Sequence, residues 1–475
     1  MNITDIIVSL PLHLVAATAV IVMLGIAARR SHRLAAGLTV AGLAAAFLSV
    51  FVAAPLVPRQ LSSLLLIDHY ALFFTGLLIA SAAAVAVLCY RYLENHDGHR
   101  EELYLLLLLA TLGCIVLVTS THFASFLLGL EILSVSLYAM VSYFRDRAQA
   151  LEAGFKYLVL ASASAAFLLF GMALIYAATG TMVFSSLRDL APSGSNSVLL
   201  IAGLALTVTG IGFKLGVVPF HLWMPDVYEG APAPVTAFIA TASKTAMVAL
   251  LLRYVPSSAI EYRPVFRVFC LIAIASMCAG NLLALRQTNV KRVLAYSSIA
   301  HFGYILVAFL AGTAMAARAV SFYLVGYTVS LISAFGIVTV LSNSDGDAGD
   351  IEDYRGLFRR RPAITGIFTA VLFSLAGIPA TMGFLGKFFV LTAGAAVSAW
   401  ALTIVLVLTS VAGLFYYLRI VVTLYSAPGE PPSRIPAMAE GGAFVLAVLT
   451  ILLIWLGVYP SPLLNLIQAA VSGLN

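Results

Sequence analysis

Long apolar stretches separated by short polar segments run along this sequence. A helix that crosses a lipid bilayer needs about 20 mainly apolar residues, and about fourteen stretches meet this requirement. They lie near residues 5–28, 33–56, 70–92, 102–119, 122–144, 149–178, 198–222, 232–254, 265–285, 291–312, 317–342, 363–394, 397–425 and 441–468. The pattern predicts an all-α polytopic membrane protein with about 14 transmembrane helices.

The composition also indicates a membrane protein. The 475 residues are 62% hydrophobic and 10% charged, and the mean hydropathy is +1.05, values outside the range of soluble globular domains. Lys and Arg are scattered among short loops, so we expect the lipid bilayer as a partner and no nucleic acid. The first apolar stretch lacks a preceding basic segment and a small-residue cleavage motif, which predicts a retained helix rather than a signal peptide.

No cofactor or metal motif is recognisable in the sequence. Cys89, Cys114, Cys270 and Cys278 lie in apolar stretches without CxxC or histidine spacing, so we expect them to be small buried side chains. A GxGxxG loop that opens a βαβ unit, a Walker A loop and an HExxH helix are also missing. We therefore expect this chain to hold no metal and no NAD, flavin, ATP or iron–sulfur cluster.

The loops that follow odd-numbered spans carry most of the loop cations, among them Arg29, Arg30 and Arg434, whereas Arg188 and Arg253 fall on the other side. Cytoplasmic loops of membrane proteins are enriched in Lys and Arg. This asymmetry predicts that the odd loops are cytoplasmic and that both termini are periplasmic.

Four of the five lysines lie within predicted spans, namely Lys156, Lys214, Lys244 and Lys387. A lysine at the centre of a membrane helix costs roughly 2.5–3.5 kcal/mol on insertion scales. Burial disfavours the charged form of an amine, so such lysines can lose and regain a proton near neutral pH. They are the principal candidates for proton carriers.

Two prolines predict helix breaks beside these lysines. Pro219 follows Lys214 and Pro379 precedes Lys387, and an interior proline removes a backbone hydrogen bond and kinks or breaks the helix. Broken helices are tolerated at membrane depth where the freed backbone faces protein or water. A titratable amine beside a helix break predicts an ion-translocating subunit, with the proton as the expected ion.

The spacing of intramembrane charges suggests an internal repeat. The interval from Lys214 to Lys387 nearly recurs between Lys244 and Arg419. Coincidental spacing of scarce charges is the alternative interpretation. Arg419 remains protonated in almost any protein setting, so we interpret it as a fixed charge or an anchor.

This spacing divides the single membrane domain into four segments. Three N-terminal helices (1–100) precede a first five-helix unit (102–254), a second unit (265–425) and a C-terminal helix (441–468). Because five is odd, the second unit must be inverted relative to the first.

Glu131 lies in an otherwise apolar span and could pair with a buried lysine such as Lys214. A carboxylate beside an ammonium keeps both groups charged, so a pair that forms and breaks would act as a proton switch. A static buried pair that only fixes helix packing is the alternative, although such pairs stabilise weakly at best.

The remaining polar candidates have weaker support. Glu152 and Lys156 are spaced four residues apart, which favours a helical ion pair, but Lys156 could also extend to the membrane interface without a function. His221 and His301 could relay protons between lysines because imidazole titrates near physiological pH. A single histidine in an apolar helix is otherwise usually a hydrogen-bonding residue of the core.

Two polar segments are harder to interpret. Segment 225–235 contains Asp226, Glu229 and three prolines and is predicted to be a rigid turn. Segment 346–362 has a run of acids followed by arginines, and it is either solvated loop surface or a docking site for a neighbouring subunit.

Three segments carry a specific family signature: GFKLGVVPFHLWMPDVYEGAPAPVTAFIATASKTA, KRVLAYSSIAHFGY and SLAGIPATMGFLGKF. Over essentially its whole length, the sequence strongly resembles the antiporter-like subunits of respiratory complex I. The resemblance implies fourteen helices with two inverted five-helix repeats, each containing a broken helix. It also implies a polar axis across the membrane arm that consists of Glu131, Lys214, Lys244 and Lys387, with Glu152, Lys156, His221 and His301 along it.

The resemblance further implies a proton-translocating membrane-arm subunit of NADH:quinone oxidoreductase (EC 7.1.1.-) in the bacterial cytoplasmic (inner) membrane. Quinone reduction elsewhere in the complex would drive it, and the isolated chain would not be catalytic. Partner subunits, including sister antiporter-like subunits, would bind NADH, flavin, iron–sulfur clusters and quinone. The alternative is a subunit of a multisubunit cation/proton antiporter that is not linked to redox chemistry.

Overall fold

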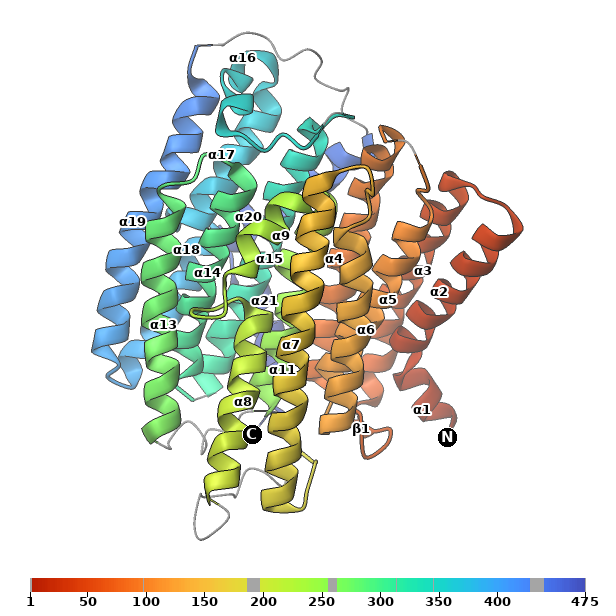
Figure 1. The fold of residues 1–475 in the computed structure, drawn as a ribbon, viewed down its shortest axis with the longest axis vertical. Coiled ribbons are helices and arrows are strands. Elements are labelled where there is room, and N and C mark those ends of the chain that lie inside the picture. Colours follow the sequence, from red (N-terminus) through yellow and green to blue (C-terminus); the bar gives the residue numbers. More distant parts are fainter. Residues whose placement is uncertain are drawn as a thin grey trace.

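The structure, a computed structural model, describes residues 2–96, 98–185, 197–254, 263–312, 314–344, 346–427 and 440–474. Helices make up most of these residues and extend between two ends of the molecule (Figure 1). Helix α1 and the end of α21 lie toward the same end, opposite α16. Two of the loop cations used to predict orientation, Arg188 and Arg434, lie outside the described residues.

The N-terminal part contains three long helices and a small hairpin in which Arg59 pairs with Ile67. In chain order its elements are α1 (Ile3–Val8), α2 (Leu10–Ala28), α3 (His32–Ala53), the 3-10 helix η1 (Ala54–Leu56), β1 (Arg59–Gln60), β2 (Leu66–Ile67) and α4 (His69–Glu94).

Two longer groups of helices follow. The first contains α5 (Glu102–Thr119), α6 (Phe123–Val141), α7 (Ala148–Thr179), α8 (Ser197–Leu215), α9 (Trp223–Gly230), α10 (Ala233–Phe238), the π-helical turn η3 (Ile239–Ser243) and α11 (Lys244–Tyr254). The second contains α13 (Arg263–Ala284), α14 (Val290–Phe309), α15 (Ala314–Leu341), the 3-10 helix η4 (Ile351–Tyr354), α16 (Leu357–Arg360), α17 (Pro362–Ala376), α18 (Met382–Ala396) and α19 (Trp400–Tyr425), and α20 (Glu440–Val458) and α21 (Ser461–Val471) end the chain.

Thirteen helical segments in the described ranges are long and apolar enough to cross a membrane. The halves α17 and α18 are individually shorter, and together they account for the remaining span predicted near 363–394. The break between them confirms the interruption predicted at Pro379. The other predicted break, near Pro219, also occurs, because α8 ends at Leu215 and α9 begins at Trp223.

Three predicted elements differ from those in the structure. The first span is interrupted at Ser9, and the predicted helix 441–468 is divided into α20 and α21, because Pro460 cannot continue a helix. Segment 225–235 is not a simple turn, because α9 occupies much of it. Pro225 lies in the first turn of α9, where a missing backbone N–H removes no helical hydrogen bond.

The same pattern of helix neighbours occurs in both groups. Helix α5 packs along α6 and against α11, and α13 packs along α14 and against α19. Helix α7 packs on α8, as α15 packs on α17 and α18. This recurrence supports the predicted pair of five-helix units.

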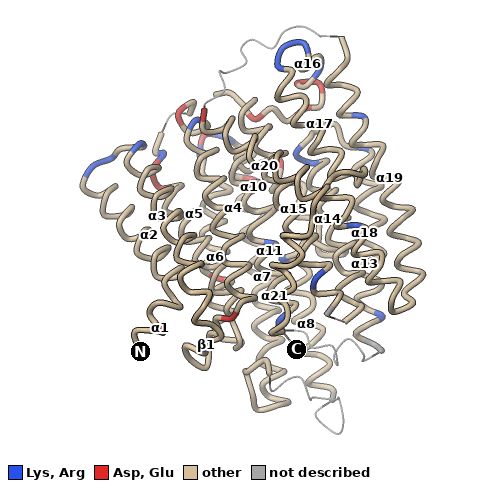
Figure 2. The backbone as a smooth tube through the Cα atoms, turned by 180° about the vertical axis from the view of Figure 1, so that it is seen from behind, with Lys and Arg blue, Asp and Glu red and all other residues tan. Residues whose placement is uncertain are grey.

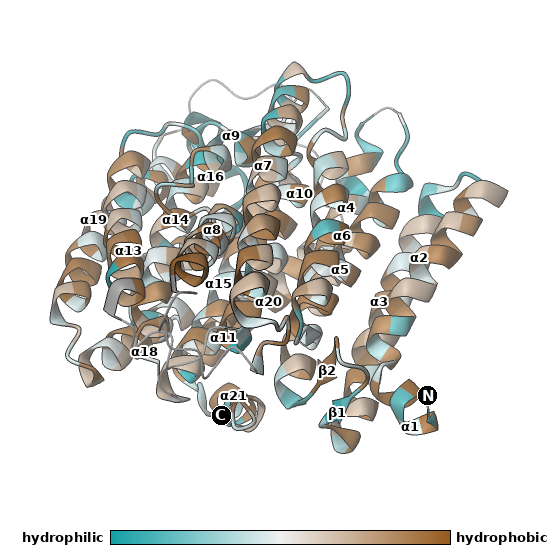
Figure 3. Ribbon diagram, turned by 60° about the horizontal axis from the view of Figure 1, so that its bottom comes forward, coloured by the Kyte–Doolittle hydropathy of each residue, from teal (hydrophilic) through white to brown (hydrophobic). Residues whose placement is uncertain are grey.

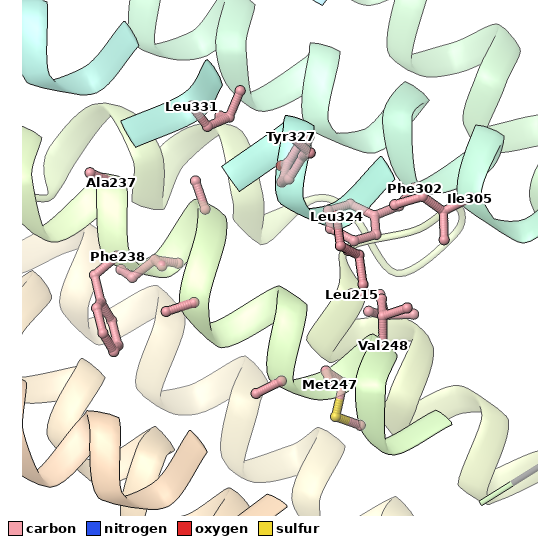
Figure 4. Close-up of a cluster of buried hydrophobic side chains, with 14 of the residues drawn as sticks. Leu215, Ala237, Phe238, Met247, Val248, Phe302, Ile305, Leu324, Tyr327 and Leu331 are labelled. Carbon is pink, nitrogen blue, oxygen red and sulfur yellow. The ribbon is translucent and has the colours of Figure 1, made fainter. Parts of the chain in front are cut away.

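The interior between the two groups is apolar. Figure 4 shows Leu215 at the end of α8 close to Val248 of α11, with Phe302 of α14 and Leu324 of α15 nearby. Along the helices, apolar residues predominate, and polar residues are more frequent in the connecting segments (Figure 3). Most Lys, Arg, Asp and Glu residues lie toward the end of the molecule that carries α16, and only a few lie at mid-height (Figure 2).

A buried ion pair fixes α4 to α11. Arg253 donates to Asp68 Oδ1 over 2.8 Å, and its guanidinium lies 5.1 Å from the centre of the Tyr70 ring. Asp68 also accepts the Ala71 N–H at the start of α4. Arg253 is therefore a buried structural cation, although the predicted orientation counts it with the loop cations.

Helices α7 and α8 approach each other closely at two glycines, and this contact positions the helix that carries Lys214. A Cβ atom at Gly171 would lie 2.8 Å from Gly203 O, and one at Gly203 would lie 2.8 Å from Gly171 O. Backbone atoms cannot move aside as a flexible side chain can. Overpacking of this kind costs about 1–3 kcal/mol.

We therefore expect Gly171→Ala to destabilise the folded chain by about 1–3 kcal/mol, measured as a lower temperature of thermal aggregation in detergent. Gly366→Ala is the matched control, because no atom lies within 4 Å of a Cβ at that helical position. Equal thermal stability of the two variants would contradict close packing of α7 on α8.

Candidate functional site

Lys244 lies at the break between α8 and α9. Its ammonium donates to Leu215 O, the carbonyl of the last residue of α8, and Gly216 continues the chain with φ +72°, a left-handed conformation that favours glycine. The side chain is 1% exposed. The break thus exposes a backbone acceptor inside the protein, and Lys244 binds it.

Lys387 makes the corresponding contact at the second break. Its Nζ donates to Ala376 O, the last residue of α17, over 2.8 Å, and to Ser410 Oγ of α19 over 2.9 Å. Gly377 follows α17 with φ +86°. By contacts, Lys387 therefore corresponds to Lys244 rather than to Lys214, which lies before its break.

Lys214 and Glu131 do not form the predicted ion pair in the described structure. Lys214 Nζ donates over 2.7 Å to Ser134 Oγ, one helical turn beyond Glu131 on α6. Glu131 Oε1 is buried and has no hydrogen-bond partner. Ser134 therefore lies where the sequence suggested a direct contact, and the Glu131 carboxylate remains available to a proton or to water.

His301 lies on α14 between the two lysines that bind helix ends. The adjacent residue Phe302 places its ring 4.9 Å from Lys244 Nζ, and Tyr304 places its ring 5.4 Å from Lys387 Nζ. His301 itself packs against Tyr304, with ring centres 5.6 Å apart. The structure therefore brings Lys244, His301 and Lys387 into one buried region.

His221 occupies the turn between α8 and α9. Its Nδ1 is buried and has no hydrogen-bond partner. No described side chain hydrogen-bonds to this nitrogen, so no direct contact at Nδ1 joins His221 to the other candidate relay residues.

The predicted Glu152 and Lys156 pair forms, and it belongs to a larger charged cluster. Lys156 Nζ lies 2.7 Å from Glu152 and 2.8 Å from Asp226 of α9. Arg292 of α14 pairs with Asp226 at 2.9 Å and with Glu229 at 2.7 Å. The two acids of the segment expected to be a turn thus tie α9 to α7 and α14.

Lys291 is a buried residue in the first turn of α14 that was not among the candidate carriers. Its ammonium donates to Asp347 over 2.6 Å and to Ala231 O, just beyond α9, over 2.7 Å. Asp347 also accepts from Tyr92 OH at the end of α4. Burial alone would raise the pKa of the Asp347 carboxyl, but Lys291 and these hydrogen bonds hold it below its ordinary value.

Three cavities adjoin these groups. Cavities of about 440 Å³ and 150 Å³ share the lining residues Gln149, Glu229 and Gly230, and the larger one also contacts Lys291 and Asp347. A third cavity of about 290 Å³ is mainly apolar and is lined by Gly377, Pro379, Phe388, Leu406, Lys387 and Ser410. Polar space therefore exists beside the charged cluster, whereas the space beside Lys387 is mainly apolar.

Arg419 donates to two carbonyls of the loop after α13, Leu285 O and Gln287 O. These contacts fit the predicted role of an anchor. In segment 346–362, Arg355 pairs with Glu352 at the surface, a contact that does not distinguish a solvated loop from a docking site.

Two comparisons of the sequence with known proteins point to the same family. The family model described as NADH:quinone oxidoreductase/Mrp antiporter, TM, matches residues 120–413. NADH-quinone oxidoreductase subunit N of Ectopseudomonas mendocina is 46% identical over 97% of this chain and 95% of that protein.

Solved structures show the same architecture. A chain of respiratory complex I from Thermus thermophilus is 33% identical, with a TM-score of 0.84 over 97% of this chain and 99% of that one. A chain of an archaeal membrane-bound sulfane sulfur reductase is 25% identical, with a TM-score of 0.85 over 100% of this chain and 98% of that one. A chain of the Mrp complex from Dietzia sp. shares the fold, with a TM-score of 0.86 at 20% identity over 100% of this chain and 98% of that one.

The matched region covers both helix breaks and the Lys214, Lys244 and Lys387 positions, and the likeness to subunit N extends over nearly the whole sequence. The chain therefore belongs to the NADH:quinone oxidoreductase/Mrp antiporter family of membrane subunits, and within that family it is similar to subunit N of NADH-quinone oxidoreductase.

Proposed function

We propose that this chain translocates protons as subunit N in the membrane arm of a bacterial NADH-quinone oxidoreductase. The near full-length likeness to a subunit N at 46% identity supports this function over that of a cation/proton antiporter component, because the Mrp chain shares the fold at only 20% identity. The observation that carries the proposal is the position of Lys244 and Lys387, each bound to the last carbonyl of a broken helix.

The helix ends make these lysines sensitive to conformation. A cation is stabilised at the C-terminal end of a helix because the helix dipole and unpaired carbonyls are negative there. If α8 or α17 moves relative to its lysine, the ammonium loses that stabilisation and burial favours the neutral amine. Movement of a helix end can thus cause the bound lysine to release its proton.

Lys214 adds a second charge at the same helix end. It precedes Leu215, whose carbonyl binds Lys244, so two ammonium groups would share the end of α8. Two like charges in a low-dielectric interior repel each other, so each lysine disfavours the protonated form of the other. Protonation of one lysine therefore promotes release from the other, and Glu131 provides a nearby carboxylate whose Oε1 has no partner.

Lys244 contacts both halves of the chain. Its Nζ lies 5.4 Å from the Trp223 ring of α9 and 4.9 Å from the Phe302 ring of α14. Aromatic faces stabilise a cation without accepting its proton. We therefore assign Lys244 to proton transfer between the Lys214 half and the Lys387 half.

The rest of the proposal concerns the setting of the chain. We propose that the two helix groups are inverted repeats, that the termini face the periplasm, and that sister antiporter-like subunits are neighbours in the inner membrane. Redox chemistry, with its NADH, flavin, iron–sulfur clusters and quinone, is assigned to partner subunits.

Replacing Lys244 by Arg should impair proton pumping almost as much as replacing it by Ala. Arginine keeps the positive charge and the hydrogen bond to the helix end, but it does not release its proton in a protein. Pumping is measured by dye quenching in sealed membrane vesicles that contain the assembled complex.

Lys291→Arg is the matched control for this change, because Lys291 is equally buried but pairs with the Asp347 carboxylate. The control should assemble and pump. Wild-type pumping by Lys244→Arg in a fully assembled complex would show that Lys244 is a fixed charge.

The purified chain alone should oxidise no NADH and should contain no stoichiometric flavin or iron. The proposal assigns these groups to partner subunits, since the sequence has no motif that would hold them. Absorbance spectra and metal analysis of the single chain provide the measurement. Retention of stoichiometric flavin or iron by this chain would refute the assignment of redox chemistry to its partners.

A further inference from the structure

His301 is bonded through both ring nitrogens to tyrosine hydroxyls. Nδ1 lies 2.7 Å from Tyr323 OH of α15, and Nε2 lies 3.3 Å from Tyr417 OH of α19. The histidine and Tyr323 are each 4% exposed and Tyr417 is 1% exposed. An imidazole held in this way can take a proton at one nitrogen and release one at the other.

The chain of polar groups continues beyond the histidine. Tyr417 OH also hydrogen-bonds Ser297 Oγ, which lies one helical turn before His301 on α14 and is 0% exposed. Tyr323, His301, Tyr417 and Ser297 thus form an unbroken series. Each member carries a hydrogen that it can donate and a lone pair that can accept.

The two ends of this series point to different parts of the protein. At one end, the Tyr323 ring packs against Gly386, the residue before Lys387, since a Cβ at Gly386 would lie 3.1 Å from that ring. At the other end, Ser297 lies between His301 and the start of α14 at Val290. That start adjoins the charged cluster, because the next residues are Lys291 and Arg292, and Figure 2 shows charged residues gathered toward that end.

Buried hydroxyls need hydrogen-bond partners in any protein, so a purely structural network must be considered. The neighbouring residue Tyr416 provides the comparison. Its hydroxyl donates to Asn281 Oδ1 over 3.1 Å, and Asn281 Nδ2 donates to Tyr304 OH over 2.8 Å. An amide holds its protons far more tightly than an imidazole does, so the branch from Tyr416 through Asn281 stabilises the fold but does not relay protons.

We propose that Tyr417 and Ser297 relay protons between His301 and the charged end of the molecule, an inference that rests on the proton-translocating function proposed above. Sequence reasoning missed these two residues because tyrosine and serine in apolar helices give no signal of their own. The hydrogen-bonded series becomes apparent only in the structure, where residues of α14, α15 and α19 contact one another.

The transfer balances at every atom. Tyr323 OH gives its proton to His301 Nδ1 and takes up another from the Lys387 side. The Nε2–H bond of His301 breaks at the same time, and the Nε2 proton forms a bond to Tyr417 O. The original Tyr417 proton passes to Ser297 Oγ, and the original Ser297 proton passes to a water molecule. Each hydroxyl gains one proton and loses one, and rotation of the side chains restores the starting arrangement.

The central test is Tyr417→Phe in the assembled complex, because this change removes one oxygen and keeps the ring. We expect proton pumping and coupled NADH oxidation to fall by roughly tenfold. This loss is smaller than the usual effect of removing a positioned acid–base group, because water can partly substitute for the missing hydroxyl. Tyr354→Phe is the matched control, because it removes an equally buried hydroxyl that donates to Ala348 O outside the series, and it should keep most of the activity. Wild-type pumping by Tyr417→Phe, or equal losses in both variants, would overturn the relay.

Ser297 provides a second test if Tyr417→Phe fails to assemble. Ser297→Ala should slow pumping, and Ser297→Thr should retain it because threonine keeps the hydroxyl. Equal pumping by both Ser297 variants would overturn the relay. A larger solvent deuterium isotope effect in Ser297→Ala than in wild type would support it, because a structural defect alone does not make proton transfer slower relative to other steps.

Lys387→Ala separates the relay from the function on which it rests. If Lys387→Ala stops pumping but Tyr417→Phe does not, the relay is wrong and the proposed function stands. If Lys387→Ala pumps normally in an assembled complex, the proposed function itself is wrong.

Discussion

An ammonium group buried among apolar helices must find an acceptor, and this protein supplies acceptors by ending two helices inside its core. Lys244 binds the last carbonyl of α8, and Lys387 binds the last carbonyl of α17. A buried polar group without a partner costs several kcal/mol in a hydrocarbon setting. The broken helices and the lysines therefore satisfy each other, because each would be unfavourable alone.

This mutual dependence explains the arrangement around the two breaks. Gly216 and Gly377 have positive φ angles and allow the chain to turn at the helix ends. The contact between Gly171 and Gly203 fixes α8 against α7. The charged cluster described above holds α9 from the other side of the break, and Lys291 binds the carbonyl of Ala231 just beyond α9. Helix α9 thus lies between the break bound by Lys244 and the cluster to which it contributes Asp226 and Glu229.

Sequence patterns predicted the spans, the two breaks and the intramembrane lysines, because hydropathy and proline act locally. They did not predict that Lys214 binds Ser134 rather than Glu131, or that Lys291 and Arg253 are buried. Those contacts join residues far apart in the chain, and their formation depends on how the helices pack. Segment 225–235 was misjudged for another reason, since proline at the start of a helix resembles proline in a turn.

If lysines bound to helix ends exchange protons, Lys387→Arg should lower the number of protons that the assembled complex pumps per NADH oxidised. Arg419→Lys is the control, because it makes the converse change at a residue bound to loop carbonyls. We expect a ratio of protons to NADH well below wild type for Lys387→Arg and a wild-type ratio for Arg419→Lys. A wild-type ratio for Lys387→Arg in an assembled complex would contradict it.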